Sequence, residues 1–258
     1  LAFVGWHPVT LELVYAQLMI ILLVLLCLAM RYLAQDRDVA AGILIGLAVA
    51  IKLMAWPLWL LLILRRQWRA LFASVACFMC LSVVGVAIIG LDHAMTYYLD
   101  VSRTVLGLYR ACTYNYSLST IGWRLFHRTQ CDTIIGIVAL PLFPGPGLAH
   151  MMAWALPAAL IACCLIACRN TEDLELQYAL MVGACILASP IAWMHYLVLA
   201  VVPFVVIVTR LRGSFGEKSR RWRLQLWVLV ALTYVPEHTV SAFLGRLGTD
   251  EGVRHAGE

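Results

Sequence analysis

Charged residues are scarce in this sequence. Asp, Glu, Lys and Arg make up 13% of its 258 residues and hydrophobic residues make up 63%, whereas soluble domains carry about 25% charged and about 45–50% apolar residues. This composition excludes an ordinary water-soluble domain. Apolar runs of about 20 residues that lack the alternation of barrel strands are typical of helices that cross a bilayer. We therefore predict an integral membrane protein with an all-α fold, a polytopic transmembrane helical bundle in contact with membrane lipids.

The sequence also lacks the motifs of several enzyme classes. It contains no nucleotide-binding glycine loop, no HExxH and no GxSxG, and the first absence disfavours an ATP-driven pump. Cys77 and Cys80 have CxxC spacing, but no second pair accompanies them, so the metal signal is weak. We expect neither a metal nor another cofactor. The net charge of +5 is spread over loops that flank apolar runs, so nucleic acid is not an expected partner.

Most of the nine cysteines lie in apolar runs, where a thiol behaves as a small hydrophobic group. Cys112 and Cys131 differ, because both fall in the one long polar connection. If that connection faces an oxidising compartment, the two cysteines could form a disulfide. The sequence leaves this pairing open.

The apolar runs predict where the chain crosses the membrane. They cover residues 11–30, 39–64, 70–89, 148–167, 176–209 and 222–235. The runs 39–64 and 176–209 are long enough for two short crossings each, so we predict about eight membrane helices in a single transmembrane domain over residues 1–258. Residues 134–143 are too few to cross, and whether 222–235 crosses is left open.

Arginines near the ends of the runs predict the orientation, because basic loops stay in the cytoplasm. Two clusters follow the first two runs, namely Arg31 with Arg37, and Arg65 with Arg66 and Arg69. If both clusters are cytoplasmic, residues 39–64 form a hairpin whose turn near Lys52 lies on the far side. The alternative is one tilted helix with a buried lysine, and we favour the hairpin.

The same reasoning orients the rest of the chain. It makes residues 90–147 an extracytoplasmic loop region and residues 210–223, with six basic side chains, a cytoplasmic loop. Residues 176–209 become a second hairpin with Ser189, Pro190 and His195 at its outer turn. Both hairpin turns and the long loop then share the extracytoplasmic face. Polar groups at membrane depth commonly mark a substrate path.

Lys52 is the one charged residue within the run 39–64. It could be a lysine whose ammonium extends to the interface, or a cation held for the phosphate of a lipid-linked substrate. Gly42 and Gly46 precede it as a GxxxG pair, which allows close helix packing. His195 lies beside Trp193 and Tyr196, either in an interfacial aromatic belt or as a group that donates to phosphate or transfers a proton.

The long loop carries many side chains that could contact a hydroxyl-rich ligand, among them Asp92, Asn115 and Arg124. Carboxylates and amides hydrogen-bond hydroxyl groups, and arginines attract anionic head groups. Residue by residue, most of this set is expected to be solvated interfacial surface.

Three blocks together resemble the polyprenol-phosphate-dependent glycosyltransferases of family 87, in the GT-C superfamily. The first is the glycine-rich stretch 41–52, which ends in Lys52 and continues through Pro57 to Arg65-Arg66-Gln67-Trp68-Arg69. The second is Ser189-Pro190-Ile191-Ala192-Trp193-Met194-His195. The third is Asn115-Tyr116-Ser117 with Arg124. The resemblance covers roughly residues 9–211.

The resemblance weakens around Tyr15-Ala16-Gln17, where only Gln17 matches the family pattern. Enzymes of this superfamily take a catalytic carboxylate from the first outer loop, and the first run seen here is similar to a later helix. We therefore expect the general base to lie upstream of Leu1, in an N-terminal part that this chain lacks, and a chain without it to be inactive. The catalytic residue itself is unknown.

The resemblance implies an inverting transfer of a hexose, such as mannose, from a polyprenyl-phosphate donor to a lipid or glycan acceptor. The reaction would take place on the outer face of a bacterial plasma membrane. Lys52, His195 and Arg124 would bind the lipid phosphate, where charge develops as it departs. Substrate contacts would come from Gln17, Asp92, Asn115, Trp193 and Tyr196.

Two other functions stay open from sequence. The first is a transporter or flippase for a lipid-linked solute, since broken helices around a midplane site are typical of transporters. The second is a non-catalytic membrane assembly subunit that keeps the fold without the chemistry.

Overall fold

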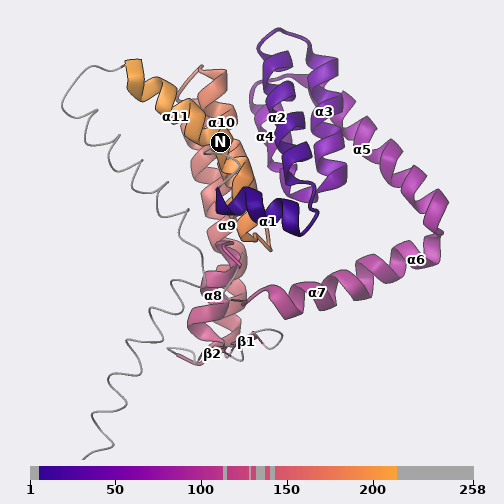
Figure 1. Cartoon of the computed structure of the whole chain (residues 1–258), viewed down its shortest axis with the longest axis vertical. Helices are drawn as coiled ribbons and strands as arrows, with labels where there is room; N and C mark the ends of the chain where they lie inside the picture. The colour runs from indigo at the N-terminus through magenta and orange to yellow at the C-terminus, as the bar shows by residue number, and fades with distance from the viewer. Residues whose placement is uncertain (1–5, 113–114, 128, 132–136, 140–142, 214–258) are drawn as a thin grey trace, which may run out of the picture. The chain divides into compact units, whose positions relative to one another are not determined.

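The computed structural model describes residues 6–112, 115–127, 129–131, 137–139 and 143–213 (Figure 1). The chain divides into two compact units, one of Leu1–Ala16 with Val208–Glu258 and one of Gln17–Ile207. The described part of the first unit contains α1 (His7–Val14) and the end of α11 (Val201–Gly213). The apolar run 222–235 and most of the basic loop 210–223 lie outside the described residues.

Helices form almost all of the described part of the second unit. In its first half these are α2 (Met19–Leu33), α3 (Asp38–Ile51), the 3-10 turn η1 (Leu53–Ala55), α4 (Pro57–Leu64), α5 (Trp68–Ile89), α6 (Leu91–Thr96), the π-helical turn η2 (Tyr97–Val101) and α7 (Ser102–Tyr109). Next come α8 (Ser119–Phe126), a two-stranded antiparallel pair of β1 (Thr129–Cys131) and β2 (Ile137–Ala139), α9 (Pro146–Arg169), α10 (Leu174–Leu187) and the 3-10 helix η3 (Met194–Ala200). The all-α prediction is confirmed.

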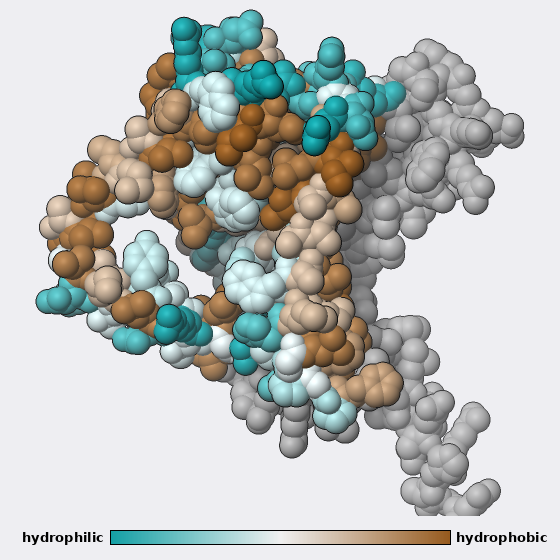
Figure 2. All heavy atoms as spheres, turned by 180° about the vertical axis from the view of Figure 1, so that it is seen from behind, coloured by the Kyte–Doolittle hydropathy of each residue, from teal (hydrophilic) through white to brown (hydrophobic). Residues whose placement is uncertain are grey.

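Bulky apolar side chains cover the outside of the longest helices. In α5, Phe72, Val83 and Ile88 are 69%, 64% and 78% exposed, and a helix that is apolar all round belongs in a membrane. Among the described residues, α5 and α9 are long and apolar enough to cross, with a third span if α1 and α2 count together. Figure 2 shows a group of hydrophilic side chains at its top and further hydrophilic side chains in its lower part, with mostly hydrophobic side chains between them. The chain is an integral membrane protein.

The predicted hairpin at residues 39–64 follows from how α3 meets α5. A Cβ on Gly46 would lie 2.5 Å from the carbonyl oxygen of Ser74, and one on Gly42 would overlap the carbonyl of Ala70. Because residue 42 faces 70 and residue 46 faces 74, α3 and α5 run in the same direction. The intervening α4 must therefore run back, so the hairpin is confirmed and the single tilted helix is wrong. Both glycines permit the close approach that their spacing predicts.

The core lies between α2, α4 and α10. Leu26, Leu58 and Met181 are fully buried there. Tyr178 on α10 is also fully buried, and its hydroxyl donates a 2.9 Å hydrogen bond to the carbonyl of Leu26 on α2. That bond satisfies the one polar atom of a large apolar side chain, as burial requires.

A second chain reversal follows α10. Asp173 caps the start of that helix by accepting a 3.2 Å hydrogen bond from the backbone N–H of Leu176, as N-cap residues do. The helix ends at Leu187, and η3 then packs back against α10 and also against α2. The break predicted at Ser189-Pro190 is therefore where the chain turns.

One prediction needs correction. The run 11–30 is not one helix, because the chain leaves the helical conformation between α1 and α2, where Ala16 has a φ of +48°. The described part of residues 90–147, the predicted extracytoplasmic loop region, contains α6, η2, α7 and α8, and its side of the membrane stays a prediction. Apolar residues at helical spacing inside this polar region, such as Val101, Val105 and Leu108, give the region helical faces that its average polarity conceals.

Candidate functional site

Lys52 lies at the tip of the first hairpin. Its backbone takes extended angles (φ −143°, ψ +116°) and ends α3, and Pro57 opens α4 a few residues later. Proline suits the first turn of a helix because its missing N–H has no partner to lose there. The half-buried side chain of Lys52 reaches the second hairpin, where its Nζ lies 3.7 Å from the centre of the Tyr196 ring. This is a close cation–π contact.

His195 and Tyr196 extend from the beginning of η3. The His195 side chain is 7% exposed, and its ring centre lies 4.9 Å from that of Tyr196 in an edge-to-face arrangement. Tyr196 thus touches His195 and Lys52 at once. The structure therefore brings together the two residues predicted to hold a lipid phosphate, one from each hairpin.

Asn115 fastens the segment before α8 to the turn of the second hairpin. Its side-chain Oδ1 accepts from the N–H of Ala192 at 2.9 Å and of Ser117 at 3.1 Å. Its Nδ2 donates to the carbonyls of Pro190 at 3.1 Å and Tyr109 at 3.2 Å. The side chain is fully buried, and these four bonds use its two donors and both lone pairs of its oxygen. In this structure Asn115 positions the turn, and contact between its amide and a substrate stays a prediction.

Further hydrogen bonds extend the same attachment. The N–H of Tyr116 donates to the carbonyl of Ala192 at 2.7 Å, and the N–H of Leu118 donates to that of Leu187 at 2.9 Å. The Ser119 hydroxyl donates to the Pro190 carbonyl at 3.1 Å. Residues 115–119 therefore run along the turn that precedes His195, and their backbone fixes where η3 begins.

Arg124, on α8, forms hydrogen bonds with the backbone of this segment. Its Nη2 donates to the carbonyl of Cys112 at 2.6 Å and to that of Asn115 at 2.9 Å. Burial lowers the pKa of the Arg124 guanidinium below its usual value. Binding of lipid phosphate by Arg124 stays a prediction, while the observed bonds hold the loop in place.

Cys112 is disulfide-bonded. Its predicted partner, Cys131, lies in β1, whose side chains are outside the described part of the structure, so the pairing with Cys131 stays a prediction. A covalent link at Cys112 would restrain the same segment that Arg124 and Asn115 hold.

Aromatic side chains pack beside the turn of the second hairpin. The rings of Trp193 and Tyr109 pack edge to face with centres 5.2 Å apart. Nearby on the loop, the Arg110 guanidinium lies 3.7 Å from the centre of the Trp123 ring. Tyr109 is one of several tyrosines within residues 90–147, and sequence reasoning did not single it out. Its contact with Trp193 marks it as a residue of the candidate site.

The two other predicted substrate residues are placed elsewhere. Gln17 is exposed just before α2, and Asp92 is exposed on α6. Figure 1 shows α6 at the far end of α5, apart from α10. Their contact with a substrate stays a prediction. Within the described residues, no three His, Cys, Asp or Glu side chains are grouped as a metal site requires.

A protein-family model matches more than half of the chain. The family model described as glycosyltransferase family 87 matches residues 1–190 of the chain. The matched segment includes Lys52, Asn115 and Arg124 and ends just before Trp193 and His195. No curated protein and no solved structure matches the chain.

Proposed function

The chain belongs to glycosyltransferase family 87, and on this premise we propose that it moves a hexose from a polyprenyl-phosphate donor to a lipid or glycan acceptor. The donor and acceptor classes, and mannose as the sugar, are part of this proposal. We place the reaction on the extracytoplasmic side of a bacterial plasma membrane. The observation that carries the proposal is the meeting of Lys52 and His195 around Tyr196.

The depth of these residues suits a lipid-linked anion. With 14 residues, α3 rises about 21 Å, less than the roughly 30 Å thickness of a hydrocarbon core. If Asp38 lies at the cytoplasmic surface, the ammonium of Lys52 lies short of the opposite one. A phosphate carried on a polyprenyl chain reaches that depth, because its lipid tail stays in the membrane while its sugar extends toward water.

In the proposed step, a general base takes the proton of an acceptor hydroxyl while the hydroxyl oxygen attacks the anomeric carbon of the hexose, and the bond from that carbon to the phosphate oxygen breaks. The phosphate leaves with one more negative charge than it carried in the donor. The Lys52 ammonium and the His195 ring stabilise that added charge where it appears. Because attack and departure occur on opposite sides of the carbon, the product has inverted configuration.

The aromatic side chains form a surface on which the sugar or lipid of the donor can pack. Trp193 and Tyr109 present ring faces and edges next to the hairpin turn, and such rings pack against the apolar face of a sugar or against prenyl methyl groups. Asn115 and Arg124 hold this surface through the loop rather than through the ligand. We therefore assign Lys52 and His195 to the phosphate, Trp193 and Tyr196 to the sugar or lipid, and Asn115 to positioning.

The test is transfer of labelled hexose from polyprenyl phosphate by the full-length protein in proteoliposomes. We expect consumption of the lipid-linked donor, with release of polyprenyl phosphate and an inverted glycosidic bond in the product. Movement of intact donor between leaflets with no cleavage would instead support a flippase, and the proposal would be wrong.

A second test concerns topology. Single cysteines placed at positions 52 and 195 in a variant without other reactive thiols should both be protected from a membrane-impermeant reagent added to the cytoplasmic side. Labelling of the two positions from opposite sides would show that they cannot share one phosphate.

A further inference from the structure

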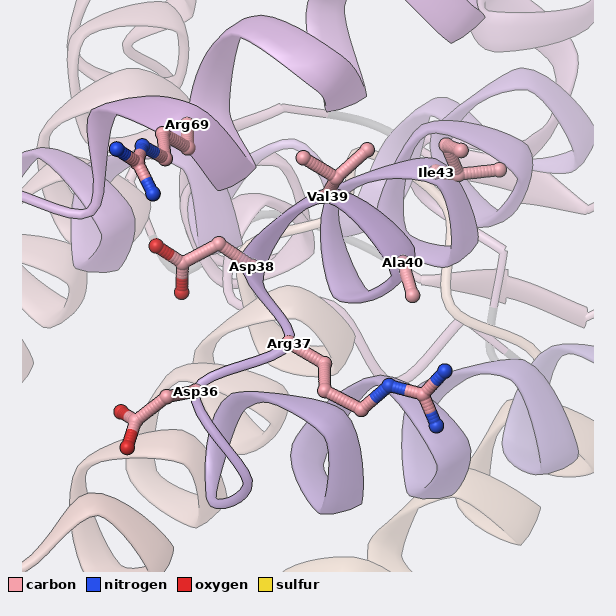
Figure 3. Close-up of a pocket in the computed structure, with 7 residues that line it drawn as sticks. All are labelled: Asp36, Arg37, Asp38, Val39, Ala40, Ile43 and Arg69. Atoms are coloured by element: carbon pink, nitrogen blue, oxygen red, sulfur yellow. The ribbon is translucent and has the colours of Figure 1, made fainter.

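The other end of α3 carries a hollow with an unusual set of charges. It measures about 440 Å³ and is lined by the turn between α2 and α3, the first residues of α3 and the start of α5. Its lining residues, all drawn in Figure 3, are Asp36, Arg37, Asp38, Val39, Ala40, Ile43 and Arg69. Since Asp38 begins α3 and Lys52 ends it, this hollow is distinct from the site at the hairpin tips.

Charges of both signs face the hollow. Figure 3 shows the carboxylate of Asp38 between the guanidinium of Arg69 and the carboxylate of Asp36, while the guanidinium of Arg37 extends away from them. Arg37 lies against the ring of Tyr32, with 4.9 Å from its Cζ to the ring centre. Within the described residues, no ion pair joins Arg69 to either carboxylate. Of the four charged side chains that line the hollow, Arg69, Asp36 and Asp38 thus lie on one side, and the guanidinium of Arg37 lies apart from them.

An apolar wall adjoins these charges. Val39 and Ile43 lie one turn apart on α3 and are 55% and 43% exposed. The hollow also lies at the arginine-rich end of the helices, which the charge bias places at the cytoplasmic surface of the membrane. Charged groups beside exposed aliphatic side chains at this depth match a phospholipid, whose head group and acyl chain meet at the same level.

We propose that this hollow binds a phospholipid whose head group carries both a phosphate and a primary ammonium, a phosphatidylethanolamine. Arg69 faces the phosphate, Asp36 and Asp38 accept hydrogen bonds from the ammonium, and the acyl chain covers Val39 and Ile43. A free phosphate or phosphoethanolamine would leave that apolar wall exposed, which is why we assign the hollow to a lipid.

The charge pattern also sets the preference among lipids. An anionic head group such as phosphatidylglycerol brings no cation for the two carboxylates, which repel its phosphate. Phosphatidylcholine brings a cation without N–H donors, and none of the seven lining residues is aromatic, although quaternary ammonium groups are typically held by aromatic rings. Phosphatidylethanolamine alone among the three satisfies both signs of charge with hydrogen bonds.

The test is native mass spectrometry of the full-length protein after delipidation, with each of the three lipids added back at equal concentration. We expect phosphatidylethanolamine to be retained at least about fivefold better than the other two, the ratio that about 1 kcal/mol of interaction produces. Equal retention of the three lipids, or tighter retention of phosphatidylglycerol, would overturn the proposal.

Three variants locate the effect. Arg69→Gln should lower phosphatidylethanolamine retention, whereas Arg31→Gln, which removes an exposed arginine at the end of α2 outside the hollow, should leave it unchanged. Asp38→Asn should raise the retention of phosphatidylglycerol relative to phosphatidylethanolamine, a gain that a misfolded protein does not show. An equal loss in Arg31→Gln and Arg69→Gln, or unchanged selectivity in Asp38→Asn, would assign the binding to general surface charge and refute the site.

Discussion

Replacing Lys52 with methionine tests the proposed chemistry most directly. Methionine keeps the length and the apolar stem of lysine but removes the ammonium that lies 3.7 Å from the centre of the Tyr196 ring. In the proposed reaction that ammonium stabilises a phosphate whose negative charge grows as the sugar departs. The substitution should therefore reduce kcat as well as kcat/KM, because the attraction is stronger in the transition state than in the bound donor.

The size of the effect follows from Coulomb's law. Two unit charges about 4 Å apart interact by about 4 kcal/mol at an effective dielectric constant of about 20. Lys52 is only half buried, so solvent screens part of this energy. A loss of about 3–4 kcal/mol in transition-state stabilisation corresponds to roughly 10²–10³-fold in kcat/KM, the range seen when one donor to a developing anion is removed.

The assay measures hexose transfer from polyprenyl phosphate in proteoliposomes under single-turnover and steady-state conditions. Lys52→Arg is the matched control, since it keeps the charge but changes the geometry of the donors. We expect its kcat/KM to fall between that of the wild type and that of Lys52→Met. Turnover by Lys52→Met within threefold of wild type would refute the assignment of Lys52 to the phosphate.

Three further predictions concern other parts of the site and fold. His195→Leu should lower turnover by about 10²-fold or more and His195→Gln by less, because glutamine keeps an N–H donor; equal losses would argue against hydrogen bonding to the phosphate. Asn115→Leu leaves several buried backbone groups without hydrogen-bond partners, at a cost of about 1–3 kcal/mol each. The midpoint of thermal unfolding in detergent should therefore fall by several degrees. An unchanged midpoint would contradict the role of Asn115 in holding the turn. Gly46→Leu should destabilise the protein by separating α3 from α5, because its Cβ alone would lie 2.5 Å from the Ser74 carbonyl. Gly85→Leu, on α5 where a Cβ meets nothing within 4 Å, is the control, and equal destabilisation of both would argue against the close α3–α5 contact.

The amino-acid sequence predicted the membrane fold because the determinants of a membrane helix are local. A run such as 70–89 needs only length and apolarity, and it appears as α5 (Trp68–Ile89). Charge bias likewise predicted the hairpin at Lys52, since the arginines on either side of the run had to share one side of the membrane. The break between α1 and α2 escaped prediction, because the apolar run 11–30 continues through it without a proline or glycine.

Family membership was also accessible from sequence, since the residues around Lys52 and around Asn115 form recognisable blocks. The sequence did not show which members of those blocks touch one another. The sequence offered Asn115, Arg124 and Asp92 equally as ligands, because each has a side chain that can bind a hydroxyl or a phosphate. Only the tertiary structure shows that Asn115 and Arg124 form hydrogen bonds with backbone carbonyls and N–H groups. That distinguishes them from Lys52 and His195, which meet around Tyr196.

The sequence by itself determined that this chain lies in a membrane, where its hairpins turn and to which family it belongs, since composition, periodicity and short motifs are properties of neighbouring residues. The tertiary structure decided that Lys52 meets Tyr196 and His195, and that Tyr109 meets Trp193. Those contacts join residues from different hairpins and from α7. They depend on how closely α3 packs on α5 and how η3 packs on α2 and α10, which no local pattern specifies.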